Sequence, residues 1–126
     1  MGFFYISDEP TDGATHGEDV AVLVAGGELD YAASPQLKAR LNKSIDACVR
    51  HVVLDLSMVT FIDSTAIGVL VGTVMRLREA ADGSLSIVCT DENLRVLRIF
   101  EIAGIDSLIA LHSSREEALA ELAVAR

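Results

Sequence analysis

The sequence predicts an α/β domain with a mixed sheet. From residue 20 onward, short runs rich in β-branched residues alternate with segments that repeat their apolar residues at helical spacing. The chain has 126 residues, which suits one hydrophobic core, and its 51% hydrophobic and 23% charged residues are typical of a folded protein. We expect four to five strands flanked by about four helices. They would form a single domain over residues 1–126, with an acidic first strand and loop over 1–17 and the core over 18–126.

The first part of the chain predicts two strands and a helix. Residues 3–7 and 20–25 are strand candidates, and because only a Gly- and Asp-rich loop over 9–19 joins them, they can pair antiparallel. Gly26 and Gly27 are expected to end the second strand. Ser34 followed by Pro35 predicts a helix that begins with Ser34 as its cap.

The second part predicts alternating strands and helices. Residues 51–56 form a run that is apolar on both faces apart from Asp55, as in a central strand covered on both sides. A long helix is expected over 64–81, a strand over 85–89 and a short strand over 108–111. Asp91 could cap a helix that stops at Gly104.

A last helix is predicted after residue 114. Ser113 and Ser114 each stand three residues before a glutamate, which is the capping-box spacing.

The charge balance excludes several functions. Nineteen acidic residues against ten basic ones give a net charge of −9, and the first 30 residues hold seven acids and no Lys or Arg. This argues against direct binding of nucleic acid and against an anionic membrane surface.

No cofactor or metal site is expected. Cys48 and Cys89 lack a second Cys or a His at metal-ligand spacing, so both are predicted to be small buried residues with reduced thiols. No signal peptide and no membrane-spanning run is recognisable, so we expect a cytoplasmic protein.

The helix over 64–81 is predicted to have one buried face and one unusual outer face. The outer face is small and apolar for its first three turns and carries Ser64, Gly68, Val69, Gly72 and Met75. Each mid-helix glycine costs about 1 kcal/mol relative to Ala, so something should offset that cost. Close approach of a partner protein is one explanation, and a tight fit against another element of the same domain is the other.

Ser64 is predicted to be an exposed hydroxyl at a helix start, where it can serve as a phosphorylation site. Asp63 precedes it, and Asp55 and Ser57 are expected at the carboxyl end of the preceding strand. Asp30 follows another strand, and in α/β sheets functional side chains gather at this edge. A phosphate on Ser64 would change what this surface can bind.

The segment Asp55-Leu-Ser-Met-Val-Thr-Phe-Ile-Asp-Ser-Thr-Ala-Ile-Gly68 resembles the signature of the STAS domain. More narrowly, it resembles bacterial anti-sigma factor antagonists. The Gly-Glu-Leu-Asp segment ending at Asp30 and the segment from Arg95 to Ile105 are similar to the same family.

The resemblance implies a phosphorylation-controlled regulator that is not an enzyme. The unphosphorylated form would bind an anti-sigma factor with serine kinase activity and so release a sigma factor. The kinase would use ATP and magnesium to modify Ser64, and a metal-dependent Ser/Thr phosphatase would reverse the modification.

The resemblance also assigns residues, because Asp30, Asp55, Ser57 and Asp63 would surround the phosphorylation site. The open outer face of the helix over 64–81 predicts the partner contacts, which are Thr65, Gly68, Val69, Gly72 and Met75. Ala66-Ile67 departs from the usual family sequence, and Thr65 is an alternative acceptor of the phosphate.

Three other readings remain. A receiver domain would need a lysine after its last strand, but the lysines here are Lys38 and Lys43, both in the first helix. A serine hydrolase would need a base, and the candidates are His16, His51 and His112. A STAS module that senses a ligand or acts as a scaffold in a stress-signalling complex is the third.

Overall fold

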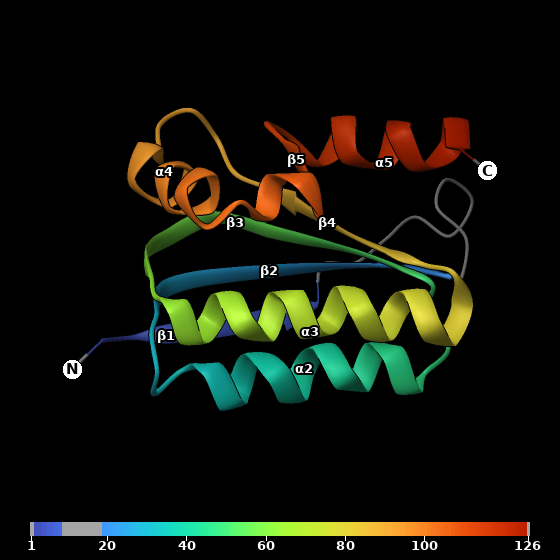
Figure 1. The fold of residues 1–126 in the computed structure, drawn as a ribbon, viewed down its shortest axis with the longest axis horizontal. Helices are drawn as coiled ribbons and strands as arrows, with labels where there is room; N and C mark the ends of the chain where they lie inside the picture. Colours follow the sequence, from blue (N-terminus) through green and yellow to red (C-terminus); the bar gives the residue numbers. More distant parts are fainter. Residues whose placement is uncertain (1, 9–18, 126) are drawn as a thin grey trace.

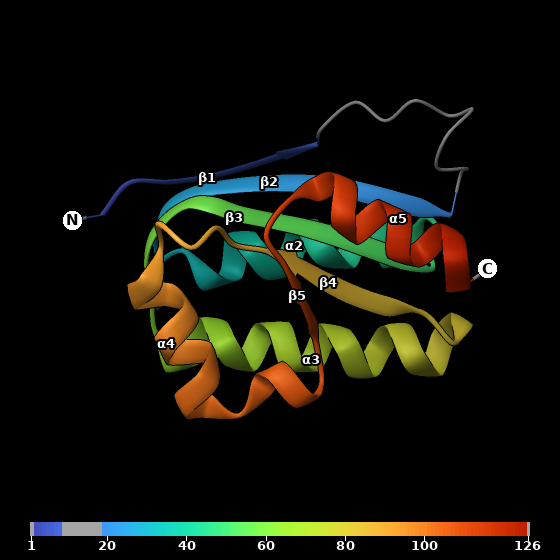
Figure 2. The ribbon, with the colours of Figure 1, turned by 90° about the horizontal axis from the view of Figure 1, so that it is seen from above.

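A computed structural model describes residues 2–8 and 19–125, and within them the predicted mixed sheet is confirmed. The five strands lie in chain order, β1-β2-β3-β4-β5 (Figure 2). β1 pairs antiparallel with β2, and the other three pairs are parallel. The strands are β1 Phe4–Asp8, β2 Val20–Leu29, β3 His51–Ile62, β4 Ser84–Val88 and β5 Ala110–His112. The loop predicted at 9–19 falls almost entirely outside the described residues.

The helices divide between the two faces of the sheet. α2 and α3 lie side by side on one face, and both begin at the end where β2 and β3 finish (Figure 1). α5 packs on the opposite face, as the view from above shows (Figure 2). The helices are α2 Ser34–Asp46, α3 Ser64–Ala81, α4 Leu94–Ala103 and α5 Arg115–Ala125, with a 3₁₀ turn over Ile105–Ser107.

Two apolar clusters hold these layers together. The larger lies between the sheet and α2, α3 and α4, and its fully buried members include Leu23, Leu41, Leu54, Leu70 and Phe100. The smaller lies under α5 and consists of Val20, Val22, Val53, Val88, Ala118 and Leu122. The side of the sheet that carries α2 and α3 therefore supplies most of the hydrophobic stabilisation.

β2 and β3 are both longer than predicted. β2 runs through Gly26 and Gly27 to Leu29, and β3 continues beyond Leu56 to Ile62. The pairing accommodates the glycines by register shifts around Gly26 and Gly27. Gly27 has a φ of 92°, and a Cβ there would lie 1.9 Å from the Phe3 carbonyl oxygen. The glycines therefore mark an irregularity inside a strand and do not end it.

Ser34 does not cap the first helix as predicted, because the residue at the capping position is Ala33, which has no side-chain cap hydrogen bond. Ser34 is buried and already helical, and its hydroxyl donates to the Asp30 carbonyl at 2.9 Å. Asp30 instead uses its carboxylate Oδ1 to accept from the Ala33 N–H at 3.0 Å.

α4 also begins later than expected. A turn in which the Asn93 N–H donates to the Thr90 carbonyl precedes it, so Asn93 is at the capping position and Asp91 is not. Gly104 ends the helix in the left-handed conformation, with a φ of 74°, as predicted.

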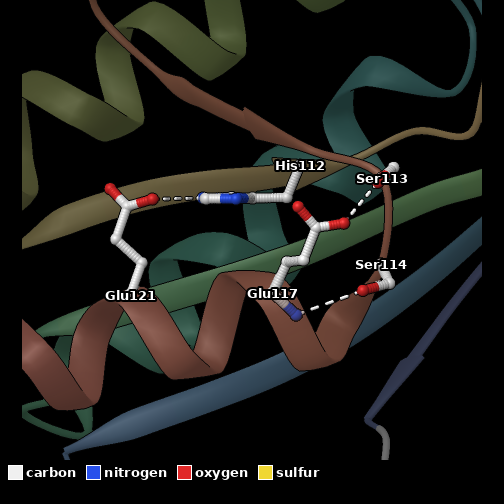
Figure 3. Close-up of polar contacts among 5 residues, drawn as sticks. All are labelled: His112, Ser113, Ser114, Glu117 and Glu121. Atoms are coloured by element: carbon white, nitrogen blue, oxygen red, sulfur yellow. Dashed lines mark hydrogen bonds and ion pairs between the residues drawn. The ribbon is translucent and has the colours of Figure 1, made fainter.

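The start of α5 confirms Ser114 as the cap, although the Glu117 carboxylate bonds the Ser113 hydroxyl and so does not complete the predicted capping box. Its hydroxyl accepts from the Glu117 N–H at 3.1 Å, while the Ser113 hydroxyl donates to the Glu117 carboxylate (Figure 3). Further along the helix, Glu121 Oε2 lies 3.2 Å from His112 Nε2 of β5.

The two cysteines lie in different environments. Cys89 is buried, and burial, with a smaller contribution from Asp55, raises the pKa of its thiol to about 11. Cys48 is exposed, so the prediction that it is buried was wrong. It follows the end of α2, with a φ of 66°, where the chain leaves the helix for β3.

Candidate functional site

The site begins where β3 ends and α3 starts. Asp63 has an extended backbone, and its carboxylate Oδ1 accepts from the Ala66 N–H at 3.1 Å. Ser64 is the first helical residue. Asp63 and not Ser64 caps the helix, because the capping side chain comes from the residue just before the first helical residue.

This arrangement leaves the Ser64 hydroxyl available. Ser64 and Thr65 are both exposed, and Ser64 makes no side-chain hydrogen bond with any residue that the structure describes. A visiting enzyme can therefore reach the Ser64 oxygen without breaking a contact that stabilises the helix. The free N–H groups of the first turn would also favour an anion at this position.

Asp30 lies at the same end of the sheet as Asp63. The Asp63 N–H donates to the Leu29 carbonyl at 3.3 Å, so the ends of the parallel strands β2 and β3 adjoin. Asp30 follows Leu29 directly. The structure thus brings Asp30 close to the start of α3. The Asp63 carboxylate caps α3, whereas the Asp30 carboxylate accepts from the Ala33 N–H in the turn before α2.

Asp55 and Ser57 are not brought to this end. Because β3 continues to Ile62, Asp55 lies seven residues before the end of the strand, on the order of 20 Å away along the strand. It is buried, and its Oδ2 lies 3.2 Å from Arg115 Nε of α5. Its Oδ1 accepts from the Ser57 N–H at 2.9 Å. Asp55 therefore anchors α5 on the opposite face of the sheet.

The outer face of α3 is open. Gly68, Gly72 and Met75 are exposed, and Val69 is half-buried. Apart from the adjacent residues and the local backbone of α3 itself, no atom lies within 4 Å of a Cβ built at either glycine. This contradicts the alternative that the glycines fit tightly against another element of the domain. The buried face is as predicted, with Leu70, Val74 and Leu77 in the core.

A groove runs between α2 and α3 along this open face. One hollow of about 390 Å³ is lined by Lys38, Asn42, Thr65, Gly68, Val69, Gly72, Thr73 and Arg76. A second, of about 520 Å³, shares Lys38, Thr65 and Val69 and extends to Tyr31, Ala32, Ser34 and Pro35. Four of the five residues predicted to contact a partner line the groove, and Met75 lies outside it.

The α2 side of the groove was missed by the sequence reasoning. Lys38 and Asn42 each follow a buried residue of α2, Leu37 and Leu41. Their spacing of four residues places them along one edge of the buried stripe. That spacing was a usable signal, but only the packing of α2 beside α3 shows that this edge faces the groove.

The described histidines lie elsewhere. His51 begins β3, roughly 35 Å from Ser64 along the strand, and its Nδ1 lies 2.8 Å from Ser84 Oγ. His112 faces Glu121 on the other side of the sheet. His16 lies outside the described residues. The described residues therefore provide no histidine near Ser64 that could act as the base of a serine hydrolase.

The described residues contain no group of three or more His, Cys, Asp or Glu side chains that could hold a metal ion. None of the described helices is both long and apolar enough to cross a membrane.

The fold and this site define a class, the small mixed-sheet α/β domains with an exposed hydroxyl at the start of a central helix. The sequence profile of the STAS domain family matches residues 14–118. The chain belongs to this family.

Two relatives align with most of the chain. The chain is 29% identical over 111 residues to the anti-sigma F factor antagonist of Paenibacillus polymyxa, covering 86% of this chain and 92% of that protein. It is 33% identical over 91 residues to the anti-sigma-B factor antagonist of Staphylococcus aureus, covering 72% and 82%.

Solved structures share the fold. An anti-sigma factor antagonist from Mycobacterium paratuberculosis superposes with a TM-score of 0.79 at 22% identity, over 94% of this chain and 93% of that one. The antagonist SpoIIAA superposes in its unphosphorylated form with a TM-score of 0.73 at 21% identity, over 94% and 96%. Its phosphorylated form from Bacillus superposes with a TM-score of 0.63 at 21% identity, over 94% and 99%.

Proposed function

We propose that this chain is an anti-sigma factor antagonist controlled by phosphorylation of Ser64. The unphosphorylated protein would bind an anti-sigma factor that is also a serine kinase, and so release a sigma factor in the cytoplasm. Membership of the STAS family and the names of its relatives support this proposal. The observation that carries it is the exposed Ser64 hydroxyl, which makes no side-chain hydrogen bond to the described residues because Asp63 caps the helix.

The chain would supply only the acceptor for the phosphate. The Ser64 oxygen would attack the γ-phosphorus of the kinase's ATP, the bond to ADP would break, and a base on the kinase would take the hydroxyl proton. The exposed position of Ser64 suits this reaction, and Asp63 would keep its hydrogen bond to the Ala66 N–H throughout. A metal-dependent Ser/Thr phosphatase would remove the phosphate and restore binding.

The added charge would act mainly on the interface and leave the fold intact. A phosphate on Ser64 carries about −1.5 to −2 charges, which the helix N-terminus favours and the neighbouring Asp63 opposes. These effects partly cancel within the domain. An interface formed by the neutral serine would have to bury a dianion, and a loss of roughly 3 kcal/mol would weaken binding about a hundredfold.

Thr65 is the alternative acceptor, because it is also exposed and follows Ser64 directly. It differs from Ser64 in lining the groove between α2 and α3. A phosphate there would enter the groove itself.

The decisive experiment is phosphorylation by candidate anti-sigma kinases, with ATP and magnesium, followed by intact mass and site mapping. We expect one phosphate on the parent chain, located at Ser64, and none on Ser64→Ala. Thr65→Ala tests the alternative and should be modified like the parent. Ser114 is an internal control, because its hydroxyl already caps α5. Absence of binding and of modification with every candidate kinase would contradict the proposal and favour a ligand-sensing or scaffold module.

A further inference from the structure

The groove between α2 and α3 differs in charge from the rest of the protein. Acidic residues outnumber basic ones by 19 to 10 in the chain as a whole. Yet the described residues that line the two adjoining hollows include Lys38 and Arg76 and no carboxylate. The groove is therefore a locally cationic surface on an acidic domain.

The two cations of the groove are not equivalent. The Arg76 guanidinium donates to the Asn42 side chain and lies 3.6 Å from the Asp46 carboxylate, so its charge is partly balanced within the domain. Lys38 makes no ion pair with the described residues, is exposed, and lines both hollows. Lys38 is thus the cation of the groove that remains available to a partner.

The floor of the groove beside Lys38 has space for a large side chain. Gly68 and Gly72 are one helical turn apart, about 6 Å along the axis, and neither has an atom within 4 Å of its missing Cβ. Val69 lies half-buried between them and provides an apolar contact.

From these observations we infer that the groove binds a segment of the anti-sigma partner that carries a bulky apolar side chain next to a carboxylate. The apolar side chain packs over Gly68 and Gly72, and the carboxylate pairs with Lys38. This inference rests on the proposed function and specifies the chemistry of the partner. The ion pair between Lys38 and the partner's carboxylate contributes to the orientation of the partner and to the rate of association more than to affinity alone.

The same geometry links the groove to the phosphorylation switch. Thr65 lines both hollows, and Ser64 precedes it at the start of the helix. A phosphate on Ser64 therefore adds negative charge next to the groove that receives the partner's carboxylate. Like charges repel, so the modification opposes the contact that Lys38 favours.

The test compares two charge reversals on one helix. Lys38→Glu and Lys43→Glu make the same change at exposed positions of α2, but only Lys38 lines the groove. Binding of the unphosphorylated chain to the anti-sigma kinase is measured by calorimetry. We expect Lys38→Glu to weaken binding about tenfold or more, which corresponds to about 1.4 kcal/mol, and Lys43→Glu to change it less than about twofold.

Two further measurements separate the charge contact from a folding effect. Lys38→Met keeps the aliphatic stem and should weaken binding less than Lys38→Glu, with a smaller dependence on salt concentration than the parent. Replacing an Asp or Glu of the anti-sigma factor with Lys should restore binding to Lys38→Glu and to no other variant. Thermal unfolding of each variant serves as the control for folding.

The outcomes distinguish the inference from the proposed function. If the parent chain binds the kinase and the two charge reversals behave alike, the inference is overturned and the proposed function stands. If the parent binds no anti-sigma kinase, both are overturned. A dimer of this chain that Lys38→Glu dissolves would also overturn the inference, because the groove would then hold a second copy.

Discussion

Serines lie at the starts of both α3 and α5, but the two helices differ in whether the serine hydroxyls form hydrogen bonds. At α5, Ser114 accepts from the Glu117 N–H and Ser113 donates to the Glu117 carboxylate (Figure 3). At α3, Asp63 caps the helix, and Ser64 has no side-chain hydrogen bond with the described residues. At one helix start the serine hydroxyls are hydrogen-bonded, and at the other the serine hydroxyl is exposed.

The two helices also differ in the residues that occupy their exposed positions. The exposed positions of α5 carry residues with high helix propensity, such as Glu116, Glu117 and Ala120, and two glutamates in the first turn complement the helix dipole. α3 has glycines at two exposed positions and no acidic residue in its first turn. The exposed residues of α5 therefore favour the helix, while the two glycines of α3 lower its helix propensity and leave its outer surface open.

The largest expected effect concerns the exposed hydroxyl of α3. Ser64→Asp places a charge at the interface and should weaken binding to the anti-sigma kinase about a hundredfold, or roughly 3 kcal/mol. Ser64→Ala should bind like the parent, because the hydroxyl supports no contact in the described structure. Calorimetric titration measures both, and equal affinity of Ser64→Asp and the parent would refute the switch.

A smaller effect is expected from filling the open face of α3. Gly72→Leu should fold normally, because no atom lies within 4 Å of the added Cβ, and should lower partner affinity about tenfold. Ala80→Leu is the matched control at an exposed position of the same helix that lines neither hollow. If both variants keep parental affinity in the same titration, the open face is not the docking surface.

Removing a helix cap should lower the free energy of unfolding by more than removing the Ser64 hydroxyl. Ser114→Ala and Asp63→Ala each remove a cap and should destabilise the domain by about 1 kcal/mol. Ser64→Ala should have an effect below about 0.5 kcal/mol, since it removes no cap. Urea unfolding monitored by circular dichroism compares the three. A loss at Ser64→Ala as large as at Ser114→Ala would show that the two helix starts are equivalent.

The smallest expected effect is a gain in stability. Gly68→Ala should raise the free energy of unfolding by up to about 1 kcal/mol, because alanine has the higher helix propensity and its methyl group meets open space. Gly83→Ala is the control with the opposite sign, since its Cβ would lie 1.8 Å from the Arg50 carbonyl oxygen. Chemical unfolding resolves both. Destabilisation by Gly68→Ala would mean that the glycine has a structural role inside the domain.

Several elements could be predicted because their signals are local. The bounds of α3, the cap at Ser114 and the end of α4 at Gly104 all follow from residues within a few positions of one another. The length of β3 could not be predicted in this way. Its polar residues after Leu56 look like a strand end, but pairing with β2 carries the strand on to Ile62.

The same limit explains which candidate residues lie together on the exposed face of α3 and which do not. Ser64, Thr65, Gly68 and Gly72 share one helix, so the helical repeat alone puts them on one exposed face. Asp55 was expected near them, but β3 carries it to the middle of the sheet, where Arg115 pairs with it. Lys38 was not considered part of the site, because it comes from another helix.

The sequence by itself determined the family, the order of strands and helices, and the exposed hydroxyl at the start of the central helix, because each is encoded in neighbouring residues. Only the tertiary structure decided that Asp63 frees that hydroxyl, that Asp55 serves α5, and that Lys38 faces Gly68 and Gly72 across a groove. These relations depend on strand length and on the packing of α2 against α3. Strand length and helix packing depend on the whole domain, and no local stretch of sequence specifies them.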